Sequence, residues 1–199
     1  GDDLGYNLSG AINVPLSETF AIRANAFTRR DPGYVDNPVR NEKGLNTGNF
    51  EGGHVAGLWE PSDRFSIKLN VLHQSSRTDG LARSDDLPGF GDLEQDLLIK
   101  SGWLEKEVTA LTANLVAGLG RTELTSVTGY NTNEFSDSID LVPFSELTES
   151  VFGVTGTPLL DDIRTEKFTQ ELRLAVPLGE RLEWLIGGFY THEKSDTAQ

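Results

Sequence analysis

The stretch TEKFTQELRLAVPLGERLEWLIGGFYTHE, residues 165–193, decides the fold because its side chains alternate with a period of two. Successive side chains of a β-strand point to opposite faces, so each arm, 165–176 and 182–193, separates an apolar from a mostly polar face. The stretch therefore predicts a β-hairpin whose turn is 177–181. Apart from an interruption at Gln170, its apolar face consists of Phe168, Leu172, Leu174, Val176, Trp184, Ile186, Gly188 and Tyr190.

The length of the two arms is as informative as their alternation. Strands of soluble domains run about 5–6 residues, whereas a tilted strand of about ten residues crosses a lipid bilayer. Each arm has the second length. The hairpin is therefore expected to span a membrane.

Composition narrows the possible classes of protein. The 199 residues contain no run near 18 apolar residues, which excludes a transmembrane helix and leaves a β-barrel as the spanning structure. The net charge of −14 argues against nucleic acid as a partner. No cysteine is present, so disulfides, zinc–thiolate sites and thiol catalysis are excluded.

Six further segments with similar patterning precede the hairpin, and the eight expected strands are joined alternately by short and long connections. An antiparallel meander with tight turns at one end and long loops at the other is typical of outer-membrane barrels. The expected fold is all-β, with about eight long strands forming part of a larger transmembrane barrel. The expected strands are 6–14, 20–29, 50–59, 65–74, 108–117, 121–132, 165–176 and 182–193.

Aromatic residues fall at both ends of the expected strands. Phe20, Phe65 and Trp184 lie at the short-turn ends, and the long-loop ends carry Tyr6, Tyr130, Phe168 and Tyr190. Such rows resemble the aromatic girdles of membrane interfaces. Trp59 lies at the first rim, but its parity disagrees with that of Phe50, so a bulge or a different strand start is expected there. A short helix is expected within 92–106.

Several of these segments resemble the barrel of TonB-dependent outer-membrane receptors. The resemblance rests on residues 168–174 with 183–190, and on 58–67, 10–16, 30–35 and 124–130, which fall in the family's order and cover most of the chain. It implies a barrel of about 22 strands around a plug, in the outer membrane of a Gram-negative bacterium. Residues 1–199 are accordingly expected to be a fragment without the plug, the TonB box or the C-terminal strands.

The resemblance implies active import of a scarce nutrient, most often a ferric siderophore, powered by TonB through the plug. Cobalamin, nickel complexes and saccharides remain alternative substrates. Polar-face residues near the long-loop rim are the expected ligand contacts, and basic groups there suit anionic metal chelates. These candidates are Arg29, Gln74, Lys167, Thr169 and Glu193. The implied partners are outer-membrane lipid, TonB and a small-molecule ligand.

Motifs for catalysis are missing from the sequence. No nucleophile elbow, P-loop or dinucleotide fingerprint occurs, so we expect no enzyme and no cofactor. The acidic residues between 85 and 96 lack the spacing of an EF-hand, and the three histidines are widely separated, so no metal site is expected. Two alternatives stay open: a complete eight-stranded outer-membrane barrel, and a soluble β-sandwich that binds carbohydrate.

Overall fold

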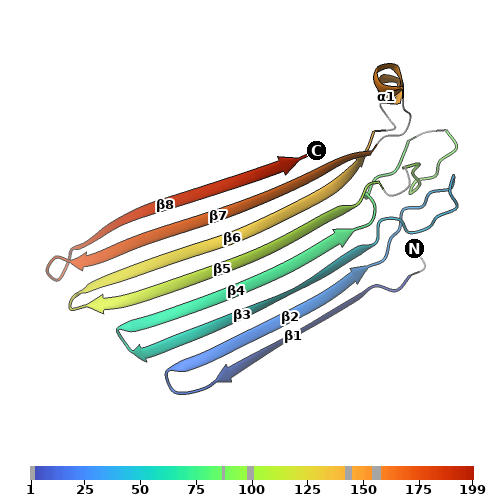
Figure 1. Ribbon diagram of the computed structural model, residues 1–199. Helices are drawn as coiled ribbons and strands as arrows, with labels where there is room; N and C mark the ends of the chain where they lie inside the picture. The colour runs from blue at the N-terminus through green and yellow to red at the C-terminus, as the bar shows by residue number, and fades with distance from the viewer. Residues whose placement is uncertain (1–2, 87, 98–100, 142–144, 154–157) are drawn as a thin grey trace.

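The protein is a single antiparallel sheet of eight strands in chain order, as a computed structural model shows (Figure 1). The structure describes residues 3–86, 88–97, 101–141, 145–153 and 158–199. Its elements are β1 (Tyr6–Pro15), β2 (Phe20–Asp31), β3 (Gly48–Ser62), β4 (Phe65–Thr78), β5 (Leu104–Leu119), β6 (Thr122–Asp140), α1 (Ser145–Phe152), β7 (Pro158–Pro177) and β8 (Glu183–Ala198).

The predicted meander is confirmed, and its strands extend further toward the long loops than predicted. The four tight turns lie at one end of the sheet, and the long connections and α1 lie at the other (Figure 1). The third long connection is much shorter than expected, because β6 and β7 continue for 19 and 20 residues. The outer end of β6 is mostly polar, and the outer end of β7 mixes Leu159, Leu160 and Ile163 with two aspartates, so the alternation that marks the strands in the sequence is lost there.

The helix expected within 92–106 is wrong for the described part of that range. Residues 92–97 are loop, β5 already begins at Leu104, and 98–100 lie outside the described residues. The four-residue spacing of Leu93 and Leu97 does not reflect a shared helix face, because the two side chains differ in exposure. Leu97 is buried, and its carbonyl oxygen accepts hydrogen bonds from Asn37 and Arg40 of the first long loop, whereas Leu93 is half exposed. The helix that does form, α1, lies in the third connection.

The register of the sheet assigns every strand residue to one of two faces, because directly paired residues share a face. The predicted faces of the hairpin are confirmed: Leu174 pairs with Ile186, and Arg173 with Gly187. Continued across all strands, the pairs build one apolar and one polar face. The apolar face includes Leu8, Ile12, Val14, Phe20, Ile22, Val55, Trp59, Phe65, Ile67, Leu69, Val71, Leu111, Leu115, Leu124, Leu172, Leu174, Trp184 and Ile186.

Trp59 and Phe50 of β3 lie on opposite faces of the sheet, and Phe50 is the one that lies on the polar face. Trp59 pairs with Phe20 and Ile67 on the apolar face, as expected for the rim. Phe50 pairs with Arg29 on the polar face. A bulge does occur, but it lies between Trp59 and Ser62, toward the tight turn, so it leaves the faces of the preceding strand unchanged.

Most fully buried side chains lie in the long loops rather than in the sheet. Val35, Asn37, Gln95 and Leu97 are at most 3% exposed. Asp36 N donates to Leu93 O at 2.9 Å, and Gln95 N donates to Asp36 O at 2.9 Å, which fastens the first long loop to the second. A single-layer sheet cannot bury its own faces, so these loops supply the core of the described structure.

The architecture bears on both structural alternatives. A β-sandwich needs two sheets, but all eight strands belong to one, so the sandwich expectation is wrong. A closed eight-stranded barrel needs β1 paired with β8, whereas these strands are the two edges of the sheet. Among the described residues, no helix is long and apolar enough to cross a membrane.

Candidate functional site

The polar face of the sheet carries a network of amides, hydroxyls and basic groups. Asn70 Nδ2 donates to Thr112 Oγ1 at 2.9 Å, joining β4 to β5. The Arg23 guanidinium donates to Asn13 Oδ1 at 3.3 Å, and the Asn25 amide lies 3.3 Å from His54 Nδ1. Asparagine is unfavourable in strands, so its repetition on one face indicates a hydrated or partner-contacting surface. The asparagines on this face are Asn7, Asn13, Asn25, Asn70, Asn114, Asn131 and Asn133.

Three of the five predicted ligand contacts lie together on β7 and β8. Lys167 Nζ is 3.0 Å from a carboxylate oxygen of Glu193, its direct partner across the strand pair. Thr169 pairs with Thr191 two residues further along, and its hydroxyl lies over Gly129. Because Lys167 and Glu193 are both partly exposed, their ion pair is worth at most about 1 kcal/mol.

The other two predicted contacts lie at the opposite side of the sheet. Arg29 Nε donates to Asp31 Oδ1 at 2.7 Å, and the guanidinium lies 5.4 Å from the centre of the Phe50 ring. Gln74 on β4 pairs with Gly52 and Val108. Arg29 is therefore fixed by a carboxylate and a ring within the sheet.

The five predicted residues share the polar face, but the sheet does not gather them into one site. β2, which holds Arg29, is five strands from β7, which holds Lys167. At about 4.8 Å per strand, this separation is about 24 Å measured across the sheet. The geometry separates the predicted contacts into an Arg29–Gln74 group and a Lys167–Thr169–Glu193 group.

The opposite face presents an uncharged band. Among the described residues, the polar side chains between the register row of Phe65 and the row of Tyr130 and Phe168 are Ser126, Thr128 and Gln170, on β6 and β7. The Gln170 amide bonds both hydroxyls, so these groups satisfy one another. The charged residues of this face lie toward the long loops, and they include Glu51, Glu107, Glu134, Arg164, Glu166 and Lys194. Trp59 and Phe65 stack edge to face at the other rim, with ring centres 5.7 Å apart.

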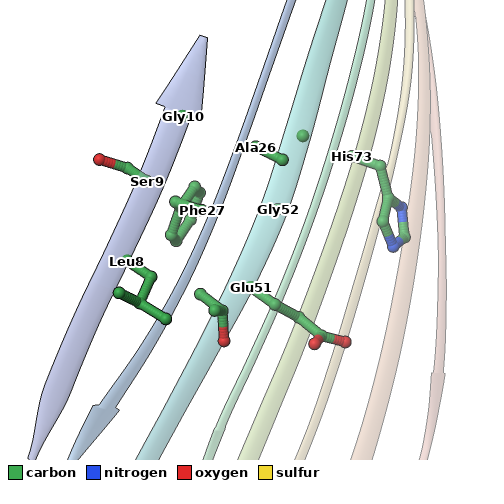
Figure 2. Close-up of a pocket in the computed structure, with 10 residues that line it drawn as sticks. Leu8, Ser9, Gly10, Ala26, Phe27, Glu51, Gly52 and His73 are labelled. Atoms are coloured by element: carbon green, nitrogen blue, oxygen red, sulfur yellow. The ribbon is translucent and has the colours of Figure 1, made fainter.

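A shallow hollow of about 600 Å³ opens over β1–β4 (Figure 2). Gly53 and Ala26 leave room between Leu8 and His73, all on the apolar face. A neighbouring hollow of about 730 Å³ shares Gly53 and His73 and extends to Val71. Neither hollow includes any of the five predicted contacts.

Sequence reasoning missed three basic residues of the polar face. Arg23, Lys68 and Lys106 are exposed there, on β2, β4 and β5. Strand parity alone places Arg23 and Lys68 on this face. They were not among the expected ligand contacts, because only residues near the long-loop rim were selected. Lys106 fell within the expected helix, so its strand position had no signal in the sequence.

The acidic second loop is held by internal hydrogen bonds. Asp85 Oδ2 accepts from the backbone N–H of Asp96 at 2.9 Å, and Asp85 Oδ1 accepts from Arg83 at 2.7 Å. Partial burial raises the pKa of Asp85, but these two donors lower it more, so the pKa lies below its usual range. Within the described residues, no three His, Cys, Asp or Glu side chains are grouped to hold a metal ion.

No family model and no curated protein matches the chain. Among solved structures, it is similar to the ferric yersiniabactin uptake receptor FyuA from Yersinia pestis, with a TM-score of 0.73 and 12% identity. That match covers 97% of this chain and 29% of the receptor. A second match is the ferric-catecholate import receptor Fiu from E. coli K12, with a TM-score of 0.65 and 12% identity, covering 98% and 35%.

The chain thus spans about a third of the length of the receptors that it matches. At this level of identity the likeness concerns the fold. The eight-stranded antiparallel meander of this chain has the fold of the parts of these two receptors that it matches.

Proposed function

We propose that this chain is a segment of a TonB-dependent receptor in the outer membrane of a Gram-negative bacterium. Residues 1–199 would form about a third of the barrel wall, with the plug and the remaining strands elsewhere in the protein. The tight turns would face the periplasm and the long loops the exterior. The apolar face would meet lipid, and the polar face would line the interior.

The uncharged band between the aromatic rows is the observation that carries this proposal. Strand β1 from Tyr6 to Val14 covers eight residue steps, about 26 Å at 3.3 Å per step. A tilt near 40° leaves about 20 Å across the membrane, close to the apolar band of about 25 Å in outer-membrane barrels. Large apolar side chains remain exposed throughout this face, including Leu69, Leu172 and Ile186 at 49–55%. Lipid contact accounts for an exposure that water would disfavour.

The proposed activity is active import of a scarce nutrient, most often a ferric siderophore, powered by TonB through the plug. FyuA is a ferric yersiniabactin uptake receptor and Fiu is a ferric-catecholate import receptor, which supports this choice of substrate. Arg29, Gln74, Lys167, Thr169 and Glu193 are the proposed ligand-facing residues. No covalent chemistry is part of the proposal.

Spin labels on neighbouring residues of β5 test the membrane orientation. Leu111 lies on the apolar face and Thr112 on the polar face, near the middle of the strand. In the full-length protein in lipid bilayers, a label at Leu111→Cys is expected to collide with oxygen and to avoid a water-soluble nickel chelate. A label at Thr112→Cys should lack this preference for the lipid phase. Equal behaviour at the two positions would contradict the membrane proposal.

Transport is tested by deleting the full-length gene in its own host. We expect poor growth under iron limitation and loss of radioactive iron uptake from at least one siderophore, with recovery on complementation. The same uptake should disappear when TonB is removed. Loss of cobalamin, nickel or saccharide uptake with normal iron uptake would replace the siderophore by that nutrient.

A further inference from the structure

The outer ends of β6 and β7 continue past the aromatic row and lead into the connection that contains α1 (Figure 1). Asp137 lies seven residues beyond Tyr130, which is about 23 Å along the strand at 3.3 Å per residue. It therefore lies well outside the uncharged band that the proposed function places in the membrane. We call this part of the two strands, 135–140 with 158–163, the outer hairpin.

Two aspartates face each other directly in the outer hairpin. Asp137 of β6 pairs with Asp161 of β7 on the polar face of the sheet. The Cβ atoms of directly paired residues are about 4.5–5.5 Å apart, so the two carboxyl groups are neighbours. Oδ1 of Asp137 and Oδ1 of Asp161 are both enclosed, and neither has a hydrogen-bond partner among the described residues. The pair thus lacks the partners that a carboxylate normally has when it is withdrawn from water.

The surroundings of the pair supply no compensating positive charge. Burial and the charge of Asp161 both raise the pKa of Asp137, and no basic group among the described residues offsets them. Leu104 lies opposite Asp137 on β5, and the segment 101–103, which pairs with Ser138, carries no titratable side chain. The nearest charged residues of the polar face on β5–β8 are Lys106, opposite Phe135, Lys167, six residues from Asp161, and Glu193, opposite Lys167.

The opposite face of the same segment is complementary instead. Ser136 Oγ donates to Asp162 Oδ1 at 2.5 Å, and Arg164 Nη1 lies 2.7 Å from Glu134 Oε1. Each of these contacts joins a carboxylate of one strand to a donor of the other. Like charges placed directly opposite each other weaken a strand pair, so Asp137 and Asp161 oppose the pairing that the other face favours.

We propose that the Asp137–Asp161 pair acts as a proton switch: one shared proton joins the outer ends of β6 and β7, and loss of that proton loosens them. With the proton bound, the O–H of one carboxyl donates to the other carboxylate and satisfies oxygens that otherwise lack partners. With both groups ionised, the two negative charges repel each other across the strand pair. Loosening of the outer hairpin would free the connection that contains α1. This inference goes beyond the proposed function and does not depend on the transported substrate.

The direction of the pH effect follows from the raised pKa of Asp137. A carboxyl whose folded pKa lies above the unfolded value of about 3.9 contributes stability that is complete below that value. This contribution is lost as the pH rises through the folded pKa. Because one proton is released, the opening constant of the outer hairpin is expected to increase by at most about tenfold per pH unit in that window.

Hydrogen exchange of the full-length protein in lipid bilayers tests the switch. Amides of 135–140 and 158–163 are followed by mass spectrometry from about pH 4 to about pH 8, with correction for the intrinsic rate. We expect slow exchange at the acid end, faster exchange as the pH rises, and a plateau once both carboxyls are ionised. The paired amides of β4 and β5 are the reference and should not change. Exchange of the outer hairpin that is independent of pH, or that slows as the pH rises, overturns the proposal.

Asp137→Asn and Asp161→Asn are the diagnostic variants, because an amide keeps the shape of the carboxyl group and donates to the remaining carboxylate without titrating. Each variant should keep slow exchange at neutral pH and lose the dependence on pH over this range. Asp162→Asn is the matched control, since it neutralises the adjacent residue on the opposite face and should keep the wild-type dependence. A dependence that persists in Asp137→Asn, or one that Asp162→Asn also removes, contradicts the switch.

A divalent cation is the alternative occupant of two neighbouring carboxylates, and calcium distinguishes it from a proton. At neutral pH, neither calcium chloride nor EDTA should alter exchange of the outer hairpin in the wild type. If calcium slows this exchange to the level seen in acid, a cation joins the pair and the proton switch is wrong.

Discussion

Thr128 Oγ1 lies 2.6 Å from Gln170 Oε1, and this pair joins β6 to β7 on the face that is otherwise apolar. Gln170 Nε2 also donates to Ser126 Oγ at 3.0 Å and to the backbone carbonyl of Glu171 at 3.1 Å. Both donor hydrogens and the acceptor of the amide are therefore used. A polar group that finds its partners within the protein can face hydrocarbon without a large desolvation penalty.

Replacing Gln170 alone should destabilise the sheet, because Gln170→Leu leaves two hydroxyls without their partner on the face that the proposed function turns toward lipid. We expect a loss of about 1–2 kcal/mol in the free energy of unfolding of the full-length protein in bilayers, measured with guanidinium. The triple variant Ser126→Ala, Thr128→Val, Gln170→Leu should recover most of this loss. A triple variant less stable than the single one would show that the cluster contributes by another route.

Adding one methyl group at Gly52 should also destabilise the sheet. A Cβ atom there would lie 2.8 Å from the Phe27 ring and 2.9 Å from the carbonyl oxygen of His73, which is backbone and cannot move aside. We expect Gly52→Ala to cost about 1–3 kcal/mol, as overpacking typically does. Gly10→Ala is the matched control, since no atom lies within 4 Å of its Cβ position. Equal stability of the two variants would contradict the close packing at Gly52.

How much of this structure can be predicted from the sequence depends on the kind of interaction that stabilises each part. Strand faces were predictable because apolar and polar side chains alternate with a period of two along the strands. The extensions of β6 and β7 were not, because they are held by backbone pairing and by polar contacts such as Arg164 with Glu134. Parity placed all five site candidates on the polar face, but it contains no information on which strands lie near one another or which charges are paired.

The long loops were the least predictable part, and their packing gives a third prediction. Leu97 is 3% exposed, and its carbonyl accepts hydrogen bonds from Asn37 and Arg40 of the first loop, so Leu97→Ala should open a cavity and loosen the contact between the two loops. We expect faster proteolysis within 32–47 and 79–97 and unchanged unfolding of the sheet. Leu93→Ala removes a side chain that is 51% exposed and should have little effect. Equal proteolysis of both variants would argue against the loop core.

The same loop should respond to acid through Asp85. Partial burial raises the pKa of this carboxyl, but the Asp96 N–H and Arg83 lower it by more, so the folded value lies below the unfolded value of about 3.9. A carboxyl with a lowered folded pKa stabilises the loop fully above the unfolded value. That stabilisation is lost as the pH falls through the folded pKa. Hydrogen exchange of 79–97, corrected for the intrinsic rate, should therefore be constant from pH 7 to pH 5 and increase below about pH 4. Asp85→Asn should exchange faster already at neutral pH and lose this dependence, whereas the exposed Asp92→Asn should behave like the wild type. An identical acid response in the wild type and Asp85→Asn would remove Asp85 as its origin.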